Sequence, residues 1–273
     1  MVLSCTVRLC GLPLARRDRA VVCQQGHSYD LARSGYVNLL QPQDRRSAHA
    51  GDAKAAVAAR ARLFDAGIGR HLIDVLLRLT AALPFGEDEV IVDLGSGGGD
   101  ALAALAETRA FAGIGIDLST AAVEHAARRY PGLTWVVANA DRRLPLLDHS
   151  VAGILSLHGR RAPAECARVL TPEGFLIIAV PAPDDLIELR AIVQGEGSER
   201  DRGSIVLAEH SQHFALVDRV TARASHRLDR DALLDLLRGT YRGERTSAAA
   251  RVESLTSLEV TLASEFFVFS KSS

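Results

Sequence analysis

Residues 90–99 read VIVDLGSGGG, and this stretch decides the fold. A short apolar run ends in Asp93 and is followed at once by a glycine-rich turn, which is typical of a strand that leads into a nucleotide-cofactor pocket. The acid lies two residues before the first glycine, where it would repel a bound pyrophosphate. A cofactor that carries a positive charge fits this turn better than a dinucleotide does.

A second apolar segment, residues 112–116, ends in Asp117. Doubly wound sheets place an acid at this position to hold the hydroxyl groups of a ribose. Two acids therefore flank one glycine turn. The alternative is a nicotinamide-dependent Rossmann enzyme, but that class has a third glycine three residues after the second and a different strand ending.

Both segments resemble motifs I and II of the class I S-adenosylmethionine-dependent methyltransferases. The resemblance implies that Asp93 pairs with the ammonium group of the methionine moiety and that the glycines let the backbone approach the ligand. Leu118 is expected to pack on the adenine, and Asp141 to accept a hydrogen bond from the adenine amine; a solvated turn acid is the other interpretation of Asp141. The expected cofactor-binding residues are Asp93, Gly95, Ser96, Gly97, Asp117, Leu118, Asp141 and Arg142.

Apolar strands and helical segments alternate after residue 87, which predicts a parallel sheet. We expect an α/β fold with a seven-stranded, Rossmann-like sheet of the class I methyltransferase type, closed by an antiparallel hairpin and preceded by a small zinc-knuckle module. The predicted domains are a zinc-binding RNA-recognition module (1–40), a helical cover (41–86) and the methyltransferase domain (87–273). Asp52 is expected to cap the first helix, and 194–203 to form a surface loop. Strands are predicted at 89–94, 112–117, 133–138, 151–156, 174–180, 214–224 and 258–269, and helices at 52–66, 70–83, 99–109, 119–129, 162–170, 184–194 and 229–237.

Three of the four cysteines lie near the N-terminus and are followed closely by a histidine. The set Cys5, Cys10, Cys23 and His27 predicts a zinc site, because three thiolates and one imidazole satisfy tetrahedral zinc and replace the core that so short a segment lacks. The first pair is irregular, since four residues separate its cysteines. If the site is degenerate, the cysteines are small buried apolar residues. Cys166 is expected to be a core residue.

The positive charge is concentrated at the front of the chain, although the whole chain has a formal net charge of -1. Such a basic front end suits a polyanionic partner, whereas the alternative is that its arginines only solvate a small module. Tyr29 and Tyr36 are possible stacking partners for bases, and Tyr36 is equally plausible as module core. The candidate phosphate contacts are Arg16, Arg17, Arg19, Arg33, Arg45 and Arg46.

Residues 23–40 read CQQGHSYDLARSGYVNLL. This segment resembles the zinc-module signature of the bacterial 23S rRNA (guanine-N1)-methyltransferases of the housekeeping and tylosin-resistance type. The likeness continues through 51–52, 59–60, 64–67, the cofactor motifs and 167–174. It implies methyl transfer from S-adenosylmethionine to N1 of a guanine in a 23S rRNA stem-loop, with a possible role in macrolide resistance, and homodimer formation.

The chain departs from the family pattern around the pocket. His158, Gly159 and Arg160 stand at the end of the fourth strand, where members resemble Phe/Tyr-Ala-Pro, and Ile68 and Gly69 replace a common His-Tyr pair. These departures leave two other functions open. One is a small-molecule methyltransferase that has kept the zinc module, and the other is a non-catalytic RNA-binding protein with a relict cofactor domain.

His158 is the candidate catalytic residue, because it is the ionisable side chain nearest the expected methyl position. The guanine N1 proton must leave around the time of attack, and an unperturbed histidine pKa of about 6.5 suits a base near neutral pH. A substrate contact or a polar loop residue are the alternatives. Arg160 and Arg161 beside it are candidate phosphate contacts.

A chain of 273 residues can bury one large core and carry a small module. No apolar run approaches the roughly eighteen residues that cross a bilayer, and the first residues lack the pattern of a secretory signal. We therefore expect a cytoplasmic protein without a membrane partner.

Overall fold

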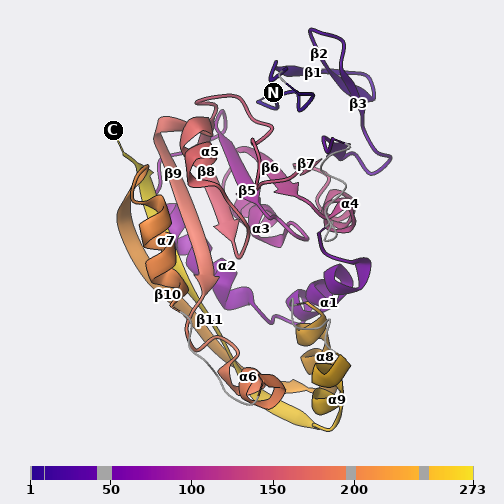
Figure 1. Ribbon diagram of the computed structural model, residues 1–273, viewed down its shortest axis with the longest axis vertical. Helices are drawn as coiled ribbons and strands as arrows, with labels where there is room; N and C mark the ends of the chain where they lie inside the picture. Colours follow the sequence, from indigo (N-terminus) through magenta and orange to yellow (C-terminus); the bar gives the residue numbers. More distant parts are fainter. Residues whose placement is uncertain (1, 9, 42–50, 195–200, 240–245, 273) are drawn as a thin grey trace.

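One mixed sheet organises the molecule. The computed structural model describes residues 2–8, 10–41, 51–194, 201–239 and 246–272 (Figure 1). Eight strands run in the order β10-β11-β9-β8-β5-β6-β7-β4; the pairs from β9 to β4 are parallel, and the pairs β9–β11 and β11–β10 are antiparallel. The strands of this sheet are β4 (Val37–Asn38), β5 (Val90–Leu94), β6 (Ala112–Asp117), β7 (Thr134–Val137), β8 (Val151–Leu157), β9 (Leu170–Pro181), β10 (Phe214–Asp229) and β11 (Ser257–Lys271).

The class I methyltransferase sheet predicted from the sequence is confirmed, and one short strand extends it. All seven predicted strands are present, and β4 adds an eighth at the edge of β7, where Val37 pairs with Val136 and Leu39 N–H donates to the carbonyl of Val137 at 2.9 Å. Two residues are too few for a periodic pattern, which is why the sequence did not predict this strand.

Nine helices are formed by the residues that the structure describes. Two of them, α7 and α9, were not predicted, and α7 begins inside the segment 194–203 that was expected to be a loop; residues 195–200 lie outside the described part of the chain. The helices are α1 (Lys54–Asp65), α2 (Arg70–Ala81), α3 (Asp100–Thr108), α4 (Thr120–Arg129), α5 (Pro163–Val169), α6 (Ile187–Gln194), α7 (Arg202–His210), α8 (Arg230–Arg238) and α9 (Thr246–Glu253).

The predicted cap of α1 is wrong. Ala53 occupies the N-cap position and no side chain caps the helix. The carboxylate of Asp52 pairs instead with Arg60, and its carbonyl accepts a hydrogen bond from Ser119 Oγ at 2.6 Å. Asp52 therefore ties the start of α1 to the loop after β6, which is a tertiary role that a local capping rule does not predict.

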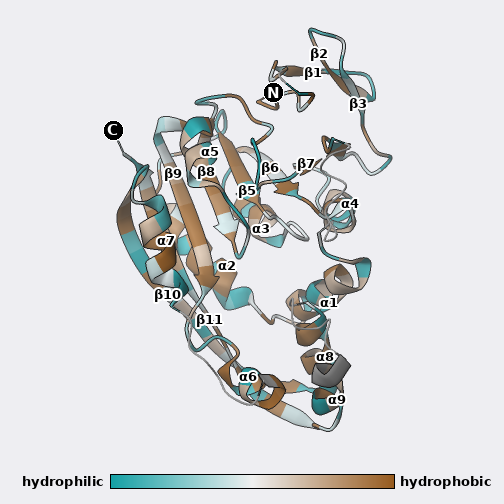
Figure 2. Cartoon of the chain, in the orientation of Figure 1, coloured by the Kyte–Doolittle hydropathy of each residue, from teal (hydrophilic) through white to brown (hydrophobic). Residues whose placement is uncertain are grey.

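The core lies on both faces of the sheet. The middle strands β5, β8 and β9 are apolar along most of their length, and their side chains are almost completely buried (Figure 2). Cys166 is fully buried within this core, as predicted. Apolar strands covered on both faces hold the strand ends rigidly, and the loops at those ends carry the chemistry.

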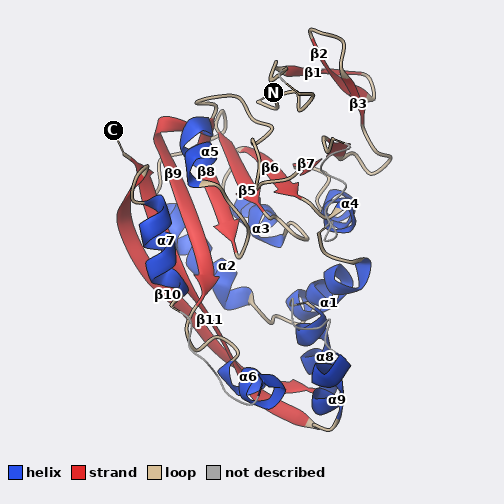
Figure 3. Cartoon of the chain, in the orientation of Figure 1, coloured by secondary structure: helices blue, strands red, loops and turns tan. Residues whose placement is uncertain are grey.

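A second, smaller sheet stands at the N-terminal end. Strands β1 (Leu14–Arg17), β2 (Ala20–Cys23) and β3 (Ser28–Asp30) pair in an antiparallel arrangement (Figure 3). We call residues 2–30 the ribbon. Its few buried apolar side chains, Leu14 and Val21 among them, belong to the same cluster as the core beneath the large sheet. The ribbon thus packs on the main body but adds little apolar core of its own.

The hairpin of β10 and β11 continues well beyond the rest of the sheet. Only the last part of β11 pairs with β9, and the other end of the hairpin carries α6, α8 and α9, with α8 packed against α1 (Figure 1). Among the described residues, none of the helices combines the length and apolar character needed to span a bilayer.

Candidate metal centre and cofactor crevice

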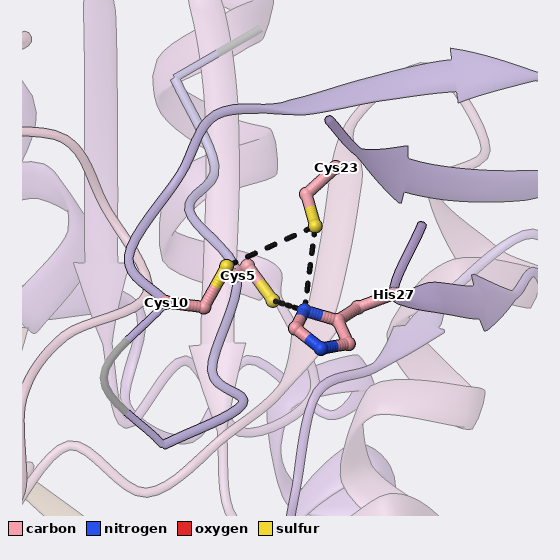
Figure 4. Close-up of side chains that lie close together, drawn as sticks. All are labelled: Cys5, Cys10, Cys23 and His27. Carbon is pink, nitrogen blue, oxygen red and sulfur yellow. Dashed lines mark hydrogen bonds between the residues drawn. The ribbon is translucent and has the colours of Figure 1, made fainter. Parts of the chain in front are cut away.

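Four side chains of the ribbon converge on one point (Figure 4). Cys5 and Cys10 come from the loop before β1, Cys23 ends β2, and His27 follows in the turn to β3. The four ligand atoms all lie within 4.8 Å of one another. The irregular first pair is accommodated by a tight turn, in which Cys10 N–H donates to the carbonyl of Val7 at 2.9 Å.

The spacing of these atoms fits tetrahedral zinc. Zinc–sulfur bonds of about 2.3 Å require sulfur atoms about 3.8 Å apart and a nitrogen slightly closer. Cys10 Sγ and Cys23 Sγ are 3.8 Å apart, and His27 Nδ1 lies 3.4 Å from both Cys5 Sγ and Cys23 Sγ. Burial alone would raise the pKa of the Cys23 thiol, but hydrogen bonds from the backbone of His27 and Gln25 lower it to about 7. The thiolate that zinc needs is therefore accessible near neutral pH.

The two predicted acids stand at the carboxyl ends of adjacent strands. Asp117, at the end of β6, accepts hydrogen bonds from Gly97 N–H at 2.9 Å and from Ser119 N–H at 2.7 Å. Burial raises its pKa, although these two hydrogen bonds oppose the shift. The two hydrogen bonds hold the glycine turn in place. Each carboxylate oxygen keeps a further lone pair, so Asp117 can still accept a hydrogen bond from a ligand.

Asp93 is buried without a partner. Its side chain at the end of β5 is only 2% exposed, and among the described residues its Oδ1 atom has no hydrogen-bond partner. Burial, with the charge of Asp117 as a smaller contribution, raises the pKa of Asp93 to about 7. A lone buried carboxylate is unfavourable unless a cation or a donor compensates it. The arrangement therefore fits a cofactor that brings an ammonium group, as S-adenosylmethionine does.

Two glycines let the loops of β5 and β8 touch. Gly95 has a φ of 75°, which favours glycine, and a Cβ on Gly159 would lie 2.2 Å from the carbonyl oxygen of Leu94. The nearby hydroxyls of Ser96 and Ser156 are also buried and lack partners within the described chain. The turn after β5 thus presents the unpaired groups of Asp93 and Ser96 beside a backbone cradle, which suits a polar ligand better than a packed core.

The predicted adenine contacts lie on the loop after β7. Asp141 is exposed, and its Oδ2 atom lies 3.1 Å from Arg160 Nη1 on the loop after β8. Leu118 is half-buried beside Asp117. Arg142 instead lines a cavity on the ribbon side of the loop. The adenine-binding role of these residues remains a prediction, and the link to Arg160 was not predicted.

His158 follows β8 in a strained backbone conformation. Its φ of 60° is uncommon for a residue with a side chain, and its Nε2 atom lies 2.9 Å from Ser264 Oγ of β11. The residue as a whole is exposed, but burial of its imidazole lowers the pKa of His158 to about 4, and the charges of Arg202 and His71 add to the effect. The imidazole is therefore neutral near pH 7.

The predicted phosphate contacts of the ribbon are exposed where the structure describes them. Arg16 and Arg17 lie on β1, Arg19 in the turn that follows, and Arg33 after β3. Arg45 and Arg46 fall outside the described residues. All four described side chains are free to meet a polyanion.

The two tyrosines considered for base stacking are half-buried. The hydroxyl of Tyr29 accepts hydrogen bonds from the backbone N–H groups of Thr6 and Val7 and lies 3.2 Å from Cys5 Sγ. Tyr36 packs against the apolar cluster of the methyltransferase sheet. Both rings are structural in this arrangement, which favours the core interpretation.

Solved structures support the fold alone. A methyltransferase from Bacillus halodurans superposes with a TM-score of 0.52 at 13% identity, covering 71% of this chain and 96% of its own. A chain from the complex of the Haloferax volcanii Trm112 methyltransferase activator with a methyltransferase gives a TM-score of 0.53 at 22% identity, covering 81% of this chain and 98% of its own. The large sheet is therefore a class I methyltransferase sheet.

Sequence relatives cover both the ribbon and the sheet. A family model for the N-terminal zinc ribbon of RlmA matches residues 4–48, and a methyltransferase-domain model matches residues 91–174. The 23S rRNA (guanine(748)-N(1))-methyltransferase of Streptomyces fradiae is 36% identical, over 95% of this chain and 94% of the relative. A Micromonospora griseorubida protein, to which a 23S rRNA guanine-N1 methyltransferase activity is ascribed, is 32% identical over 86% of this chain and 84% of its own. With its Cys3His zinc site and its methyltransferase crevice, this chain belongs to the 23S rRNA (guanine-N1)-methyltransferase family.

Proposed function

We propose that the protein transfers the methyl group of S-adenosylmethionine to N1 of a guanine in a 23S rRNA stem-loop. The observation that carries this proposal is that the 36% identity with the Streptomyces fradiae enzyme extends over the zinc ribbon and the cofactor crevice together. A chain that had kept only methyl transfer from the cofactor would need the cofactor crevice but not the zinc ribbon. A ribosomal substrate implies a cytoplasmic site of action.

The crevice residues would bind and orient the donor. Asp93 pairs with the ammonium group, Asp117 accepts from the ribose hydroxyls, and the Gly95–Gly159 contact shapes the floor between them. The bound cofactor supplies an electrophilic methyl group on a sulfonium. Alignment of this carbon with the guanine nitrogen and exclusion of water contribute most of the rate, on the order of 7–11 kcal/mol in well-oriented systems.

His158 would accept the proton that guanine N1 loses. If Ser264 Oγ accepts a hydrogen bond from Nε2–H, the lone pair of Nδ1 is available to the substrate. The low pKa of the ring keeps it neutral at pH 7, so its lone pair is available. A pKa of about 4 also makes it a weaker base than the unperturbed histidine that the sequence analysis assumed. A substrate-contact role is the alternative, and the experiments below distinguish the two.

Product mapping tests the proposed function directly. The purified protein is incubated with methyl-labelled S-adenosylmethionine and either protein-free 23S rRNA or ribosomes, and the modified position is located by primer extension, which stops at an N1-methylated guanine. We expect label in one guanine of a stem-loop. Labelling of another nucleotide, or RNA binding without label, would contradict the proposal, and the second result favours a non-catalytic RNA-binding protein.

Substitution of His158 tests the proton acceptor. His158→Ala should lower kcat by about 100-fold while KM for RNA changes little, because general-base catalysis is commonly worth 100-fold to 10,000-fold. A pH profile provides the second readout, since the rate of the variant should rise with pH as N1 ionises unaided. An increase in KM with unchanged kcat would instead make His158 a substrate contact.

Macrolide resistance and homodimer formation stay predictions. Expression of the gene in a sensitive strain should raise the inhibitory concentration of a macrolide if the methylated guanine lines the peptide tunnel. The mass in solution decides the oligomeric state.

A further inference from the structure

A cavity lies where the ribbon meets the large sheet. Its volume is about 460 Å³, and its walls come from the N-terminal loop (4–8 and 10–11), from Leu39 and Leu40 after β4, and from residues 138–139 and 142–145 after β7. Two zinc ligands, Cys5 and Cys10, stand on one side of this space, and the loops after β4 and β7 stand on the other. The cavity therefore lies at the junction of the ribbon and the large sheet.

The lining combines an apolar floor with a positive rim. Val7 and Leu40 are half-buried and contribute apolar surface, and the buried side chains of Leu39 and Leu144 also line the cavity. Arg8, Arg142 and Arg143 line the same cavity, all three are exposed, and no acidic residue lines it among the described residues. A carboxylate oxygen of Asp148 lies 3.7 Å from Arg143 Nη2. An exposed pair at that distance contributes little.

The zinc site offsets only part of this positive charge. A zinc ion with three thiolates and one imidazole carries a net charge of −1, and Cys5 and Cys10 of this site line the cavity. Arg142 has an interaction of its own and is left out of the balance. Arg8 and Arg143 together still exceed the charge of the zinc site, which favours an anionic ligand, and arginine both pairs with phosphate and stacks on a base.

The cavity also lies on the reactive edge of the sheet. Strands β4, β7, β6 and β5 are parallel, so the residues after β4 and β7 stand at the same edge as Asp93 and Asp117. Residues 139–143 run between the cavity and the cofactor crevice, since Asp141 of this loop reaches Arg160 and Arg142 and Arg143 line the cavity. A ligand held here would lie at the same edge of the sheet as the two acids proposed to bind the methyl donor.

We propose that this cavity binds one unpaired nucleotide of the RNA substrate, with its base over the apolar floor and its phosphate against Arg8 and Arg143. The inference rests on the proposed function. It assigns binding of the RNA loop to the junction of the ribbon and the large sheet, whereas the sequence analysis predicted phosphate contacts on the ribbon. The volume lies within the roughly 300–1,000 Å³ of sites for small organic ligands. Proteins read RNA loops by splaying and stacking unpaired bases.

The test compares two RNA probes of equal length, a 23S rRNA stem-loop and a fully paired RNA duplex. Binding is measured at several salt concentrations between about 50 and 300 mM, a range over which the screening of exposed charges increases strongly. For Arg8→Gln/Arg143→Gln, we expect about a tenfold loss of stem-loop affinity, a salt slope smaller by about 0.7, and loss of the preference for the stem-loop. KM for the RNA should rise while kcat stays within about twofold.

Two other double variants calibrate this result. Arg16→Gln/Arg17→Gln removes predicted phosphate contacts on the ribbon surface and should weaken the stem-loop and the duplex equally. Arg78→Gln/Arg128→Gln removes two exposed arginines of α2 and α4 that do not line the cavity, and both affinities should stay unchanged. Zinc content and calorimetric titration with S-adenosylhomocysteine confirm that each variant is folded.

The proposal is overturned if Arg8→Gln/Arg143→Gln keeps the wild-type preference for the stem-loop. It is also overturned if this variant loses zinc to a chelator more readily and weakens RNA binding only in the metal-depleted fraction, because the arginines would then serve the metal site. These results leave the proposed function standing. Failure of the wild-type protein to methylate 23S rRNA would remove that function instead.

Discussion

The ribbon and the cofactor edge of the large sheet are stabilised in different ways. In the ribbon, four ligand atoms within 4.8 Å of one another hold three short strands that have little apolar core of their own. At the cofactor edge, strands that are buried on both faces fix the loops, and the polar groups between the loops are left unpaired. One region depends on an ion for its fold, and the other is folded before its ligand arrives.

The two regions therefore use the free energy of ligand binding differently. Metal binding to the ribbon contributes directly to folding, because the ligands do not converge without the ion. Cofactor binding to the crevice compensates a buried carboxylate that the fold already holds in place. Changes to the metal ligands should therefore alter structure, whereas changes to the crevice should alter affinity first.

The largest expected effect comes from removing a metal ligand. Cys23→Ala should abolish zinc binding and unfold the ribbon, because structural zinc contributes about 10–16 kcal/mol in small zinc modules. Metal analysis should give well under one zinc per chain, and hydrogen exchange should show loss of protection over β1 to β3. Affinity for S-adenosylhomocysteine should stay within about threefold, since the crevice has its own core.

Cys166→Ala is the matched control for that variant. This cysteine is fully buried in the sheet domain and is not a ligand. Its substitution should leave the zinc content at one and lower the stability only modestly. If Cys23→Ala keeps its zinc, or if the cofactor crevice fails together with the ribbon, the contrast between the two regions is lost.

The second expected effect separates affinity from stability at Asp93. Asp93→Asn should weaken S-adenosylhomocysteine binding by about 100-fold, because the ammonium group then faces a neutral amide. The pKa of Asp93 is raised from 3.8 to about 7, so the unfolded chain ionises at lower pH than the folded one, and the cofactor-free protein loses stability as the pH rises between these values. Without cofactor, the variant should therefore be more stable than wild type at pH 8, by at most about 4 kcal/mol.

Thermal unfolding at pH 4 and pH 8 checks the stability part. The gap between variant and wild type should close at the lower pH, where Asp93 is protonated in the folded protein. A variant that unfolds more easily than wild type at pH 8 would show that Asp93 has a compensating partner in the folded chain.

A smaller effect is expected from the contact between the two loops. Gly159→Ala places a methyl group 2.2 Å from the carbonyl oxygen of Leu94, so one of the loops must move. We expect a loss of about 1–3 kcal/mol in stability and about a tenfold loss of cofactor affinity, since overpacking a rigid site has costs of this size. Gly132→Ala is the control, because nothing lies within 4 Å of the added Cβ. Equal behaviour of both variants would mean that the loops yield easily.

The smallest expected effect is a pH dependence of cofactor binding. With a pKa of about 7, Asp93 is mostly protonated at pH 6 and mostly ionised at pH 8. Affinity for S-adenosylhomocysteine should therefore be about tenfold weaker at pH 6 than at pH 8. The dependence should vanish in Asp93→Asn, and its persistence there would assign it to another group.

The sequence predicted the parts of the molecule whose signals are local. The seven main strands carry apolar runs, and the cofactor turn and the metal ligands lie close together in the chain. The contacts that shape the acceptor side are not local: 19 residues separate Arg160 from Asp141, and 106 residues separate His158 from Ser264. No spacing rule links such residues before the sheet order is known. The cap predicted at Asp52 failed for the same reason, because its true partners belong to α1 and to the loop after β6.

The two-residue strand β4 follows the ribbon in the chain and belongs to the large sheet. It covers the backbone donors and acceptors along the outer edge of β7, which would otherwise be open. A truncation that begins after residue 40 would leave that edge bare and able to recruit a strand from another molecule. Poor solubility of such a fragment would then result from the uncovered edge of β7 and not from the loss of RNA-binding residues.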